Sequence, residues 1–194
     1  MLLTDTVFEE DKILIISNIG IEGYSVLARL ASNYDKVIWI SSNPYIPFRI
    51  LKSYKIDKFE LFGFYSRFGK AINPLNLNEI SLAISRSEEE DSCIIISCIS
   101  ELIMYHGVGK IYHLILNIIS SVKKVLGLII DGAQDRRDEI LISTLFDAVF
   151  KLEKRIINGT KSVRLIPEVY VHSRVEDFDI VYDDSNVVKL TSTH

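Results

Sequence analysis

The feature of this sequence that most restricts its fold is a series of short, continuous apolar runs. Between the runs lie stretches in which apolar residues recur at helical spacing. Parallel strands that are covered on both faces have this character, because neither face is left for water. The predicted strands of this kind are residues 13–17, 36–41, 93–98 and 125–130, and the helices between them include 23–33 and about 109–124.

The remaining elements extend this alternation and then change its character. We predict a further strand at 59–65, a helix from about Leu77, a helix at 139–146 and a strand at 148–152. Asn76 and Glu79 have the spacing of a capping box, and the prolines in 42–47 are expected to interrupt any regular element there. Asn158-Gly159 lies between two β-rich runs, which is typical of a hairpin, and 178–182 with 187–190 form a second candidate hairpin.

These patterns predict one α/β domain over residues 1–194. Its sheet is mostly parallel, is flanked by helices, and finishes in antiparallel hairpin strands at the C-terminal edge. The formal net charge of −4 argues against a broad nucleic-acid surface, and the four histidines do not form a metal signature.

The cysteines and the N-terminus bear on the compartment. Cys93 and Cys98 are five residues apart in one apolar run, so on a strand they would face opposite sides and could not form a bridge. Two buried thiols are typical of a reducing compartment. The acidic N-terminus does not have the pattern of a signal peptide, and no apolar run reaches the roughly 18 residues of a membrane span. We therefore expect a cytoplasmic protein without a membrane segment.

Residues 18–25, with the sequence NIGIEGYS, lie between the first predicted strand and the first helix, where a phosphate-binding loop would lie. Such a loop has the pattern G-x-x-x-x-G-K-[ST], in which backbone amides and the lysine hold phosphates and the hydroxyl holds magnesium. Gly23 and Ser25 match the final glycine and the hydroxyl. Asn18 replaces the first glycine, and Tyr24 replaces the lysine.

The rest of the loop adds two residues to this candidate site. Gly20 is a further glycine within it, and Glu22 places a negative charge where phosphates would approach. Without the lysine, the main positive charge on the phosphates is missing, and Glu22 is expected to repel them further. A generic strand–glycine–helix turn would explain the loop equally well.

The order of elements resembles that of the RecA-superfamily ATPases, and within them the KaiC/RadA-like archaeal group. Residues 38–44, IWISSNP, resemble the end of the second strand in that group, which reads like YISLEE. Residues 94–102, IIISCISEL, resemble a Walker B strand such as VVIDSLSEL, and 147–153 resemble a segment that begins with Ala-Asp and ends with Leu-Glu. The resemblance covers about residues 10–190. It rests on the order of the elements and on their pattern of apolar and polar residues more than on invariant residues.

Position by position, the resemblance implies a degenerate nucleotide site. The lysine position holds Tyr24, the magnesium-binding aspartate falls on Ser97, and the acid that would activate water falls near Asn43. Ser25 keeps its chemistry, and Gln134 lies where such ATPases often place a γ-phosphate sensor. Phosphoryl transfer depends on electrostatic stabilisation, so these losses together predict no hydrolysis and no cofactor.

The function implied by the resemblance is that of a catalytically inactive RecA/KaiC-like pseudo-ATPase. It would act through protein contacts as a recombinase paralogue, a signalling protein or a scaffold subunit, in a homo- or hetero-oligomer with RecA-like subunits. One alternative is a weak nucleotide-binding ATPase or switch of the same family, with a role in DNA recombination or repair. A third is a small-ligand enzyme on another doubly wound fold, whose ligand would lie at the carboxyl ends of the strands.

Residues 47–70 interleave lysine and arginine with phenylalanine and tyrosine, in an otherwise acidic chain. This interleaving suits a surface for single-stranded nucleic acid or for a protein partner. It suits equally an amphipathic helix and strand that bury their aromatic rings and expose their charges. The sequence leaves both interpretations open.

Overall fold

A computed structural model describes residues 11–157, 160–170, 177–182 and 187–192. Its core is one ten-stranded sheet with the order β10-β9-β8-β7-β1-β6-β5-β2-β3-β4. All neighbouring strands from β7 through β1, β6, β5, β2 and β3 to β4 pair in parallel. The neighbouring strands from β7 to β10 pair antiparallel. The strands are β1 Lys12–Ser17, β2 Lys36–Ser41, β3 Phe59–Phe64, β4 Lys70–Ile72, β5 Ser92–Ile96, β6 Lys124–Ile130, β7 Ala148–Ile157, β8 Thr160–Tyr170, β9 Phe178–Tyr182 and β10 Val188–Ser192.

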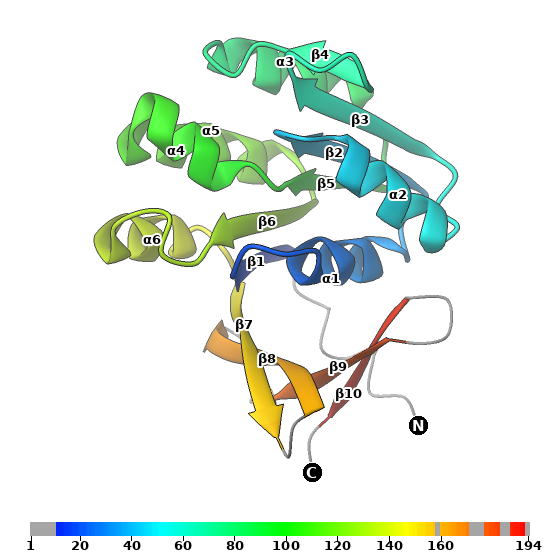
Figure 1. The fold of residues 1–194 in the computed structure, drawn as a ribbon. Helices are drawn as coiled ribbons and strands as arrows, with labels where there is room; N and C mark the ends of the chain where they lie inside the picture. The colour runs from blue at the N-terminus through cyan, green and yellow to red at the C-terminus, as the bar shows by residue number, and fades with distance from the viewer. Residues whose placement is uncertain (1–10, 158–159, 171–176, 183–186, 193–194) are drawn as a thin grey trace.

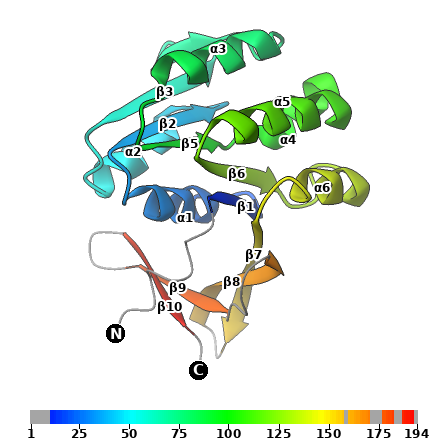
Figure 2. The same ribbon diagram turned by 180° about the vertical axis from the view of Figure 1, so that it is seen from behind.

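This arrangement confirms the predicted fold class. Figure 1 shows the hairpin strands β7–β10 at one end of the sheet and β3 and β4 at the other, and Figure 2 shows the same succession from behind. The long β7–β8 pair confirms the first predicted hairpin, although Asn158 and Gly159 themselves lie outside the described residues. The β9–β10 pair confirms the second.

Helices cover both faces of the sheet, which explains the near-continuous apolar runs. The helices α1 and α2 pack on one face through residues such as Val26, Leu27 and Leu51, and α3 to α6 pack on the other through Ile80 and others. Among the described residues, none of the helices combines the length and the apolar character needed to cross a bilayer. The helices are α1 Glu22–Ala31, α2 Tyr45–Ser53, α3 Leu77–Ser87, α4 Ile99–His106, α5 Val108–Ser121 and α6 Arg136–Ser143.

The prediction that prolines interrupt regular structure in 42–47 is wrong. Helix α2 begins directly after Pro44, which is its N-cap, and includes Pro47 in its first turn. The first turn of a helix has backbone N–H groups without intrahelical partners, so a proline there removes no hydrogen bond. These prolines therefore start a helix instead of preventing one.

The run 93–102 is divided differently from the prediction. Strand β5 ends at Ile96, and Cys98 is the N-cap of α4, a helix that we did not predict. Both thiols are free and buried, and they lie in the cores on opposite faces of the sheet, as expected. Gly107, at a φ of 77°, separates α4 from α5.

Several predicted boundaries and one cap are also corrected. Asn76 is the N-cap of α3, but its side chain makes no capping hydrogen bond, so the capping box with Glu79 is not formed. Lys124 opens β6 instead of closing a helix, and its buried amine lies 5.6 Å from the centre of the Tyr34 ring. Helix α6 starts three residues earlier than predicted, after Asp135.

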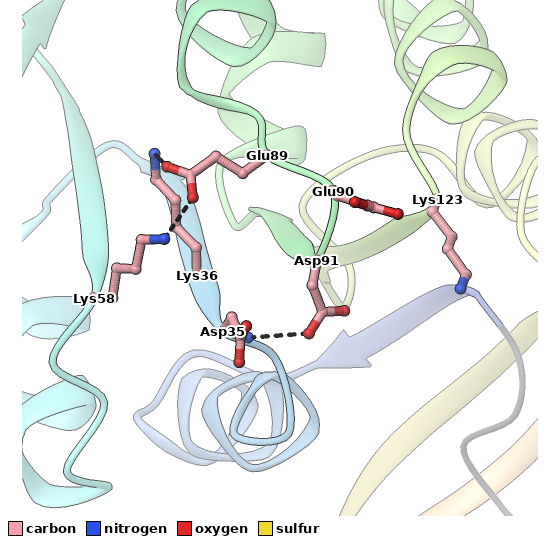
Figure 3. A pocket seen from close by; sticks show the side chains of 7 residues that line it. All are labelled: Asp35, Lys36, Lys58, Glu89, Glu90, Asp91 and Lys123. Carbon is pink, nitrogen blue, oxygen red and sulfur yellow. Dashed lines mark hydrogen bonds and ion pairs between the residues drawn. The ribbon is translucent and has the colours of Figure 1, made fainter.

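An ion-pair network ties together the amino ends of β2 and β3 and the end of α3. The buried amine of Lys36 lies 2.8 Å from Glu60 and 3.0 Å from Glu89, and it donates to the Ser87 carbonyl at 2.7 Å. Figure 3 shows Lys36 and Lys58 both directed at Glu89, in a cavity of about 410 Å³ lined by charged side chains. This edge is opposite to the edge on which the sequence placed the candidate site.

Glu60→Gln is expected to destabilise the fold by about 1–2 kcal/mol at neutral pH. Burial acts to raise the pKa of Glu60, but hydrogen bonds from Lys36, Lys70 and Ser87 outweigh it and lower the pKa to about 2. A depressed carboxyl pKa stabilises the fold above the pKa of the unfolded chain, and this contribution is lost as the pH falls from about 4.5 to about 2.

Urea denaturation of wild type and Glu60→Gln over that pH range measures this contribution. The difference in unfolding free energy between the two proteins should shrink as the pH falls. Glu88→Gln is the matched control, because Glu88 is exposed and no ion pair of the described residues includes it. A constant difference, or an equal effect of Glu88→Gln, would contradict the assignment.

Candidate functional site

The residues that the sequence singled out lie at the carboxyl edge of the parallel strands. The loop 18–21 follows β1, residues 42–44 follow β2, Ser97 follows β5, and 131–135 follow β6. Parallel strands that run side by side end at the same edge, so segments far apart in the chain meet there.

Tyr24 and Ser97 are brought together by Trp39, the single tryptophan of the chain. The Tyr24 ring stacks on the Trp39 ring, with centroids 6.0 Å apart and planes 15° apart. The Trp39 side chain is fully buried, and its indole N–H donates to the Ser97 hydroxyl at 2.9 Å. Ser97 in turn donates to the Ile40 carbonyl at 3.3 Å. We call Tyr24, Trp39 and Ser97 the tryptophan cluster.

The environment of Tyr24 keeps its hydroxyl protonated. Burial raises the pKa of Tyr24 above its ordinary value of 10.0, and the negative charge of Glu101 raises it further. Hydrogen bonds with Ser41 and Ser97 act in the opposite direction and are outweighed. Tyr24 is therefore a neutral hydrogen-bonding group at physiological pH, not a source of charge.

Glu101 is a residue of this site that sequence reasoning missed. It lies in the first turn of α4, and its Oε1 accepts a hydrogen bond from the Ser42 hydroxyl at 2.8 Å. Its Oε2 is buried without a hydrogen-bond partner among the described residues. Helical spacing across 99–106 was the signal that could have found it, since a helix after Ser97 would carry Glu101 back over the same strand ends.

The loop after β1 is exposed, and its acid is paired. Asn18 and Gly20 are exposed, and the Ile19 side chain is 84% exposed. Glu22 lies 2.9 Å from the Lys154 amine of β7, so its charge is partly neutralised instead of facing the loop alone. Gly20 has a φ of 157°, a backbone conformation that residues with a side chain rarely adopt, which explains the glycine.

Gly23 and Ser25, the two matches to the loop pattern, are both buried. A Cβ on Gly23 would lie 2.9 Å from the Leu128 side chain and 3.1 Å from Ser17, so this glycine lets α1 pack closely on the sheet. Ser25 lines a cleft of about 390 Å³ between α1 and α2. The glycine match is therefore explained by packing, without reference to a ligand.

Asn43 and Gln134 lie at the same edge but make separate contacts. The Asn43 side chain accepts a hydrogen bond from the Tyr45 N–H at 3.2 Å, at the start of α2. Gln134 accepts from the Ser100 hydroxyl at 2.7 Å and donates to the Ile130 carbonyl at 3.0 Å. The amide oxygen of Gln134 thus links the loop after β6 to α4, and its amide nitrogen links the loop to the end of β6. Within the described part of the chain, no group of three or more histidine, cysteine or carboxylate side chains could hold a metal ion.

Comparison with known proteins places the fold. No family model and no curated protein matches the sequence. The crystal structure of the flagellar accessory protein FlaH from Methanocaldococcus jannaschii is similar with a TM-score of 0.74, at 14% identity, over 98% of this chain and 95% of that one. A KaiC-like protein from Pyrococcus horikoshii is similar with a TM-score of 0.67, at 11% identity, over 94% of this chain and 90% of that one. The chain therefore has the RecA-like fold that the sequence predicted.

Proposed function

We propose that this chain, with its RecA-like fold, is a pseudo-ATPase that acts through protein–protein contacts. The observation that carries the proposal is the tryptophan cluster. The resemblance places a lysine for phosphates at position 24 and an aspartate for magnesium at position 97. This chain has an aromatic ring and a hydroxyl there, and both contact Trp39. A site built to hold a nucleotide needs charges free to face it, whereas these side chains face the core.

The remaining donors do not fit a magnesium nucleotide. The loop 18–23 has Glu22 as its one charged residue, and this acid is already paired with Lys154. Gln134, which would sense a phosphate, uses both ends of its amide within the protein. Phosphoryl transfer requires preorganised positive charge on the transferring group, so we derive no catalytic step at this site.

A second candidate is a weak nucleotide-binding switch, and Glu101 favours it. This carboxylate lies at the strand ends with one buried oxygen that no described residue satisfies. In such a switch the Ser25 hydroxyl and the backbone amides at the start of α1 would bind the phosphates, and Glu101 would bind the accompanying magnesium ion. The same experiment separates the two candidates.

Addition of millimolar ATP and magnesium is expected to change the melting temperature of the wild type by less than about 1 °C. A ligand at 100 times its Kd stabilises a protein by about 2.7 kcal/mol, which would raise the melting temperature by several degrees. Trp39 fluorescence gives an independent measurement, because Trp39 is the single tryptophan and lies at this edge.

Ser25→Ala and Glu101→Gln are the variants for this titration. A clear rise in melting temperature that either substitution abolishes would favour the nucleotide-binding switch and contradict the pseudo-ATPase. A rise that neither substitution affects would indicate binding elsewhere on the molecule.

We further propose that the chain works in a homo- or hetero-oligomer with RecA-like subunits. In support, Ile19 and Ile21 are 84% and 58% exposed on the loop at the carboxyl edge, where apolar side chains suit a protein contact better than water. Light scattering in solution tests the homo-oligomer, since a monomer has a mass of 22.1 kDa. A strict monomer at all concentrations would leave only the hetero-oligomer.

A further inference from the structure

The structure divides the basic aromatic segment 47–70 into a structural part and a small remaining surface. Phe48 and Phe59 pack against the core on the α1–α2 face of the sheet. Of the cations, Lys52, Lys58 and Lys70 pair with neighbouring carboxylates. The interpretation in which buried aromatic rings alternate with exposed, paired charges therefore accounts for much of the segment 47–70. Among the described residues it leaves three exposed cations without an ion pair: Arg49, Lys55 and Arg67.

Two of these cations lie next to exposed apolar side chains. The cleft of about 390 Å³ between α1 and α2, which we call the α1–α2 cleft, has Ile21 on one side and Tyr45 on the other, 58% and 51% exposed. The Tyr45 ring meets Phe68 edge to face, with centroids 5.7 Å apart, so the apolar surface continues beyond the cleft. The lining residues are Ile21, Ser25, Tyr45, Ile46, Arg49, Ile50, Ser53 and Tyr54.

The charge that the described residues contribute to the α1–α2 cleft is positive. Arg49 is the one charged residue among the described residues that line it, and Arg49 is exposed. Arg67 is exposed directly beside Phe68. In a chain with a formal net charge of −4, this is a local positive surface that surrounds apolar side chains. A guanidinium without a carboxylate is suited to bind one in a bidentate manner.

We propose that the α1–α2 cleft docks a segment of a partner protein in which an apolar side chain adjoins a carboxylate. The apolar side chain enters between Ile21, Tyr45 and Ile50, and the carboxylate binds Arg49. This inference rests on the proposed function, since it names the chemistry of a partner for a protein that works by contact. Complementary charge then gives the docking its specificity, and burial of the apolar anchor gives most of its affinity.

A protein segment fits this surface better than single-stranded nucleic acid. Nucleic acid needs a row of cations that follows its phosphates, together with stacking platforms. Here Lys58 and Lys70, which would extend such a row, are held by Glu89 and Glu60. The Arg49 guanidinium at the edge of the apolar cleft instead matches a partner segment that has one carboxylate next to one apolar side chain.

Selection from a displayed library of random 12-residue peptides tests the proposal. The library is selected in parallel on the wild type and on Arg49→Glu, and the enriched peptides are synthesised with a fluorescent label for anisotropy measurements. Peptides enriched on the wild type should share an apolar residue next to Asp or Glu. They should bind Arg49→Glu at least about tenfold more weakly, because a charge-assisted bond is replaced by repulsion. Tyr45→Ala should weaken them by a similar factor.

Arg137→Glu is the matched control, since Arg137 is an exposed arginine on α6, outside the α1–α2 cleft. It should bind the same peptides as the wild type does. Enriched peptides without an acid, or equal weakening by Arg137→Glu, would overturn the docking proposal. So would an oligonucleotide of 12 thymidines that binds more tightly than every selected peptide and loses affinity with Arg49→Glu.

Addition of ATP and magnesium to the peptide complex separates this inference from the proposed function. If the peptide stays bound and the melting temperature does not change, both proposals stand. If ATP displaces the peptide and Ser25→Ala prevents this, the pseudo-ATPase assignment fails, whatever the peptides contain. If the selected peptides lack the acid while ATP has no effect, the docking proposal alone fails.

Discussion

Replacement of Trp39 by alanine is expected to lower the free energy of unfolding by about 3–5 kcal/mol. The side chain is fully buried in β2, so the substitution leaves a large cavity in the centre of the sheet. It also removes the stacking partner of Tyr24 and the donor to Ser97. Urea denaturation followed by circular dichroism is the measurement, because the variant has no tryptophan to report by fluorescence.

Two further variants serve as controls for Trp39→Ala. Trp39→Phe keeps a ring for Tyr24 but removes the indole N–H, so we expect a smaller loss of about 1–3 kcal/mol. Met104→Ala, at a side chain that is 72% exposed, should change stability by less than about 0.5 kcal/mol. A loss below about 1.5 kcal/mol for Trp39→Ala would mean that the tryptophan cluster is not packed as described.

Ser97→Asp is expected to destabilise the protein by about 3–5 kcal/mol, the cost typical of a buried charge without a partner. Ser97 is 2% exposed, next to Trp39 and Cys98, and none of the charged side chains of the described residues pairs with it. Tyr24→Lys in the same protein should recover part of the loss. The Tyr24 ring stacks on Trp39, whose indole N–H donates to Ser97, so a lysine amine at position 24 would lie near the new carboxylate.

A double-mutant cycle of wild type, the two single variants and the double variant measures this recovery. We expect a favourable coupling energy of at least about 1 kcal/mol between Lys at 24 and Asp at 97. The control cycle replaces Ser97→Asp with Ser97→Asn, which has the same size without the charge and should couple by less than about 0.5 kcal/mol. Equal coupling in both cycles would show that the two positions do not meet as an ion pair.

The parts of the fold that could be predicted are those in which one local rule is sufficient. Strands covered on both faces read as apolar runs wherever they occur, and β1, β2 and β6 were located to within one residue at each end. Helix α4 was missed because a buried strand and a buried helix end have the same composition, and 93–102 contains both. Helix α2 was missed because a proline interrupts a helix or begins it depending on its position in the turn.

The candidate site was predictable as a set of positions but not as a set of contacts. Tyr24, Ser97, Asn43 and Gln134 do lie at one edge, because parallel strands end together. What each side chain contacts depends on neighbours that are distant in sequence. The negative charge of Glu22, which was expected to face the loop, instead forms an ion pair with Lys154, which is distant in the sequence.

The sequence by itself determined the α/β class, the parallel core and the terminal hairpins. These are matters of residue type and local periodicity, which need no knowledge of distant contacts. Only the tertiary structure decided that Trp39 contacts both Tyr24 and Ser97, and that Glu101 returns to the strand ends. It also decided that Arg49 lies beside an apolar cleft without an ion pair to any described residue. The physical reason is that each of these depends on which strands are neighbours, and strand order is a property of the whole chain.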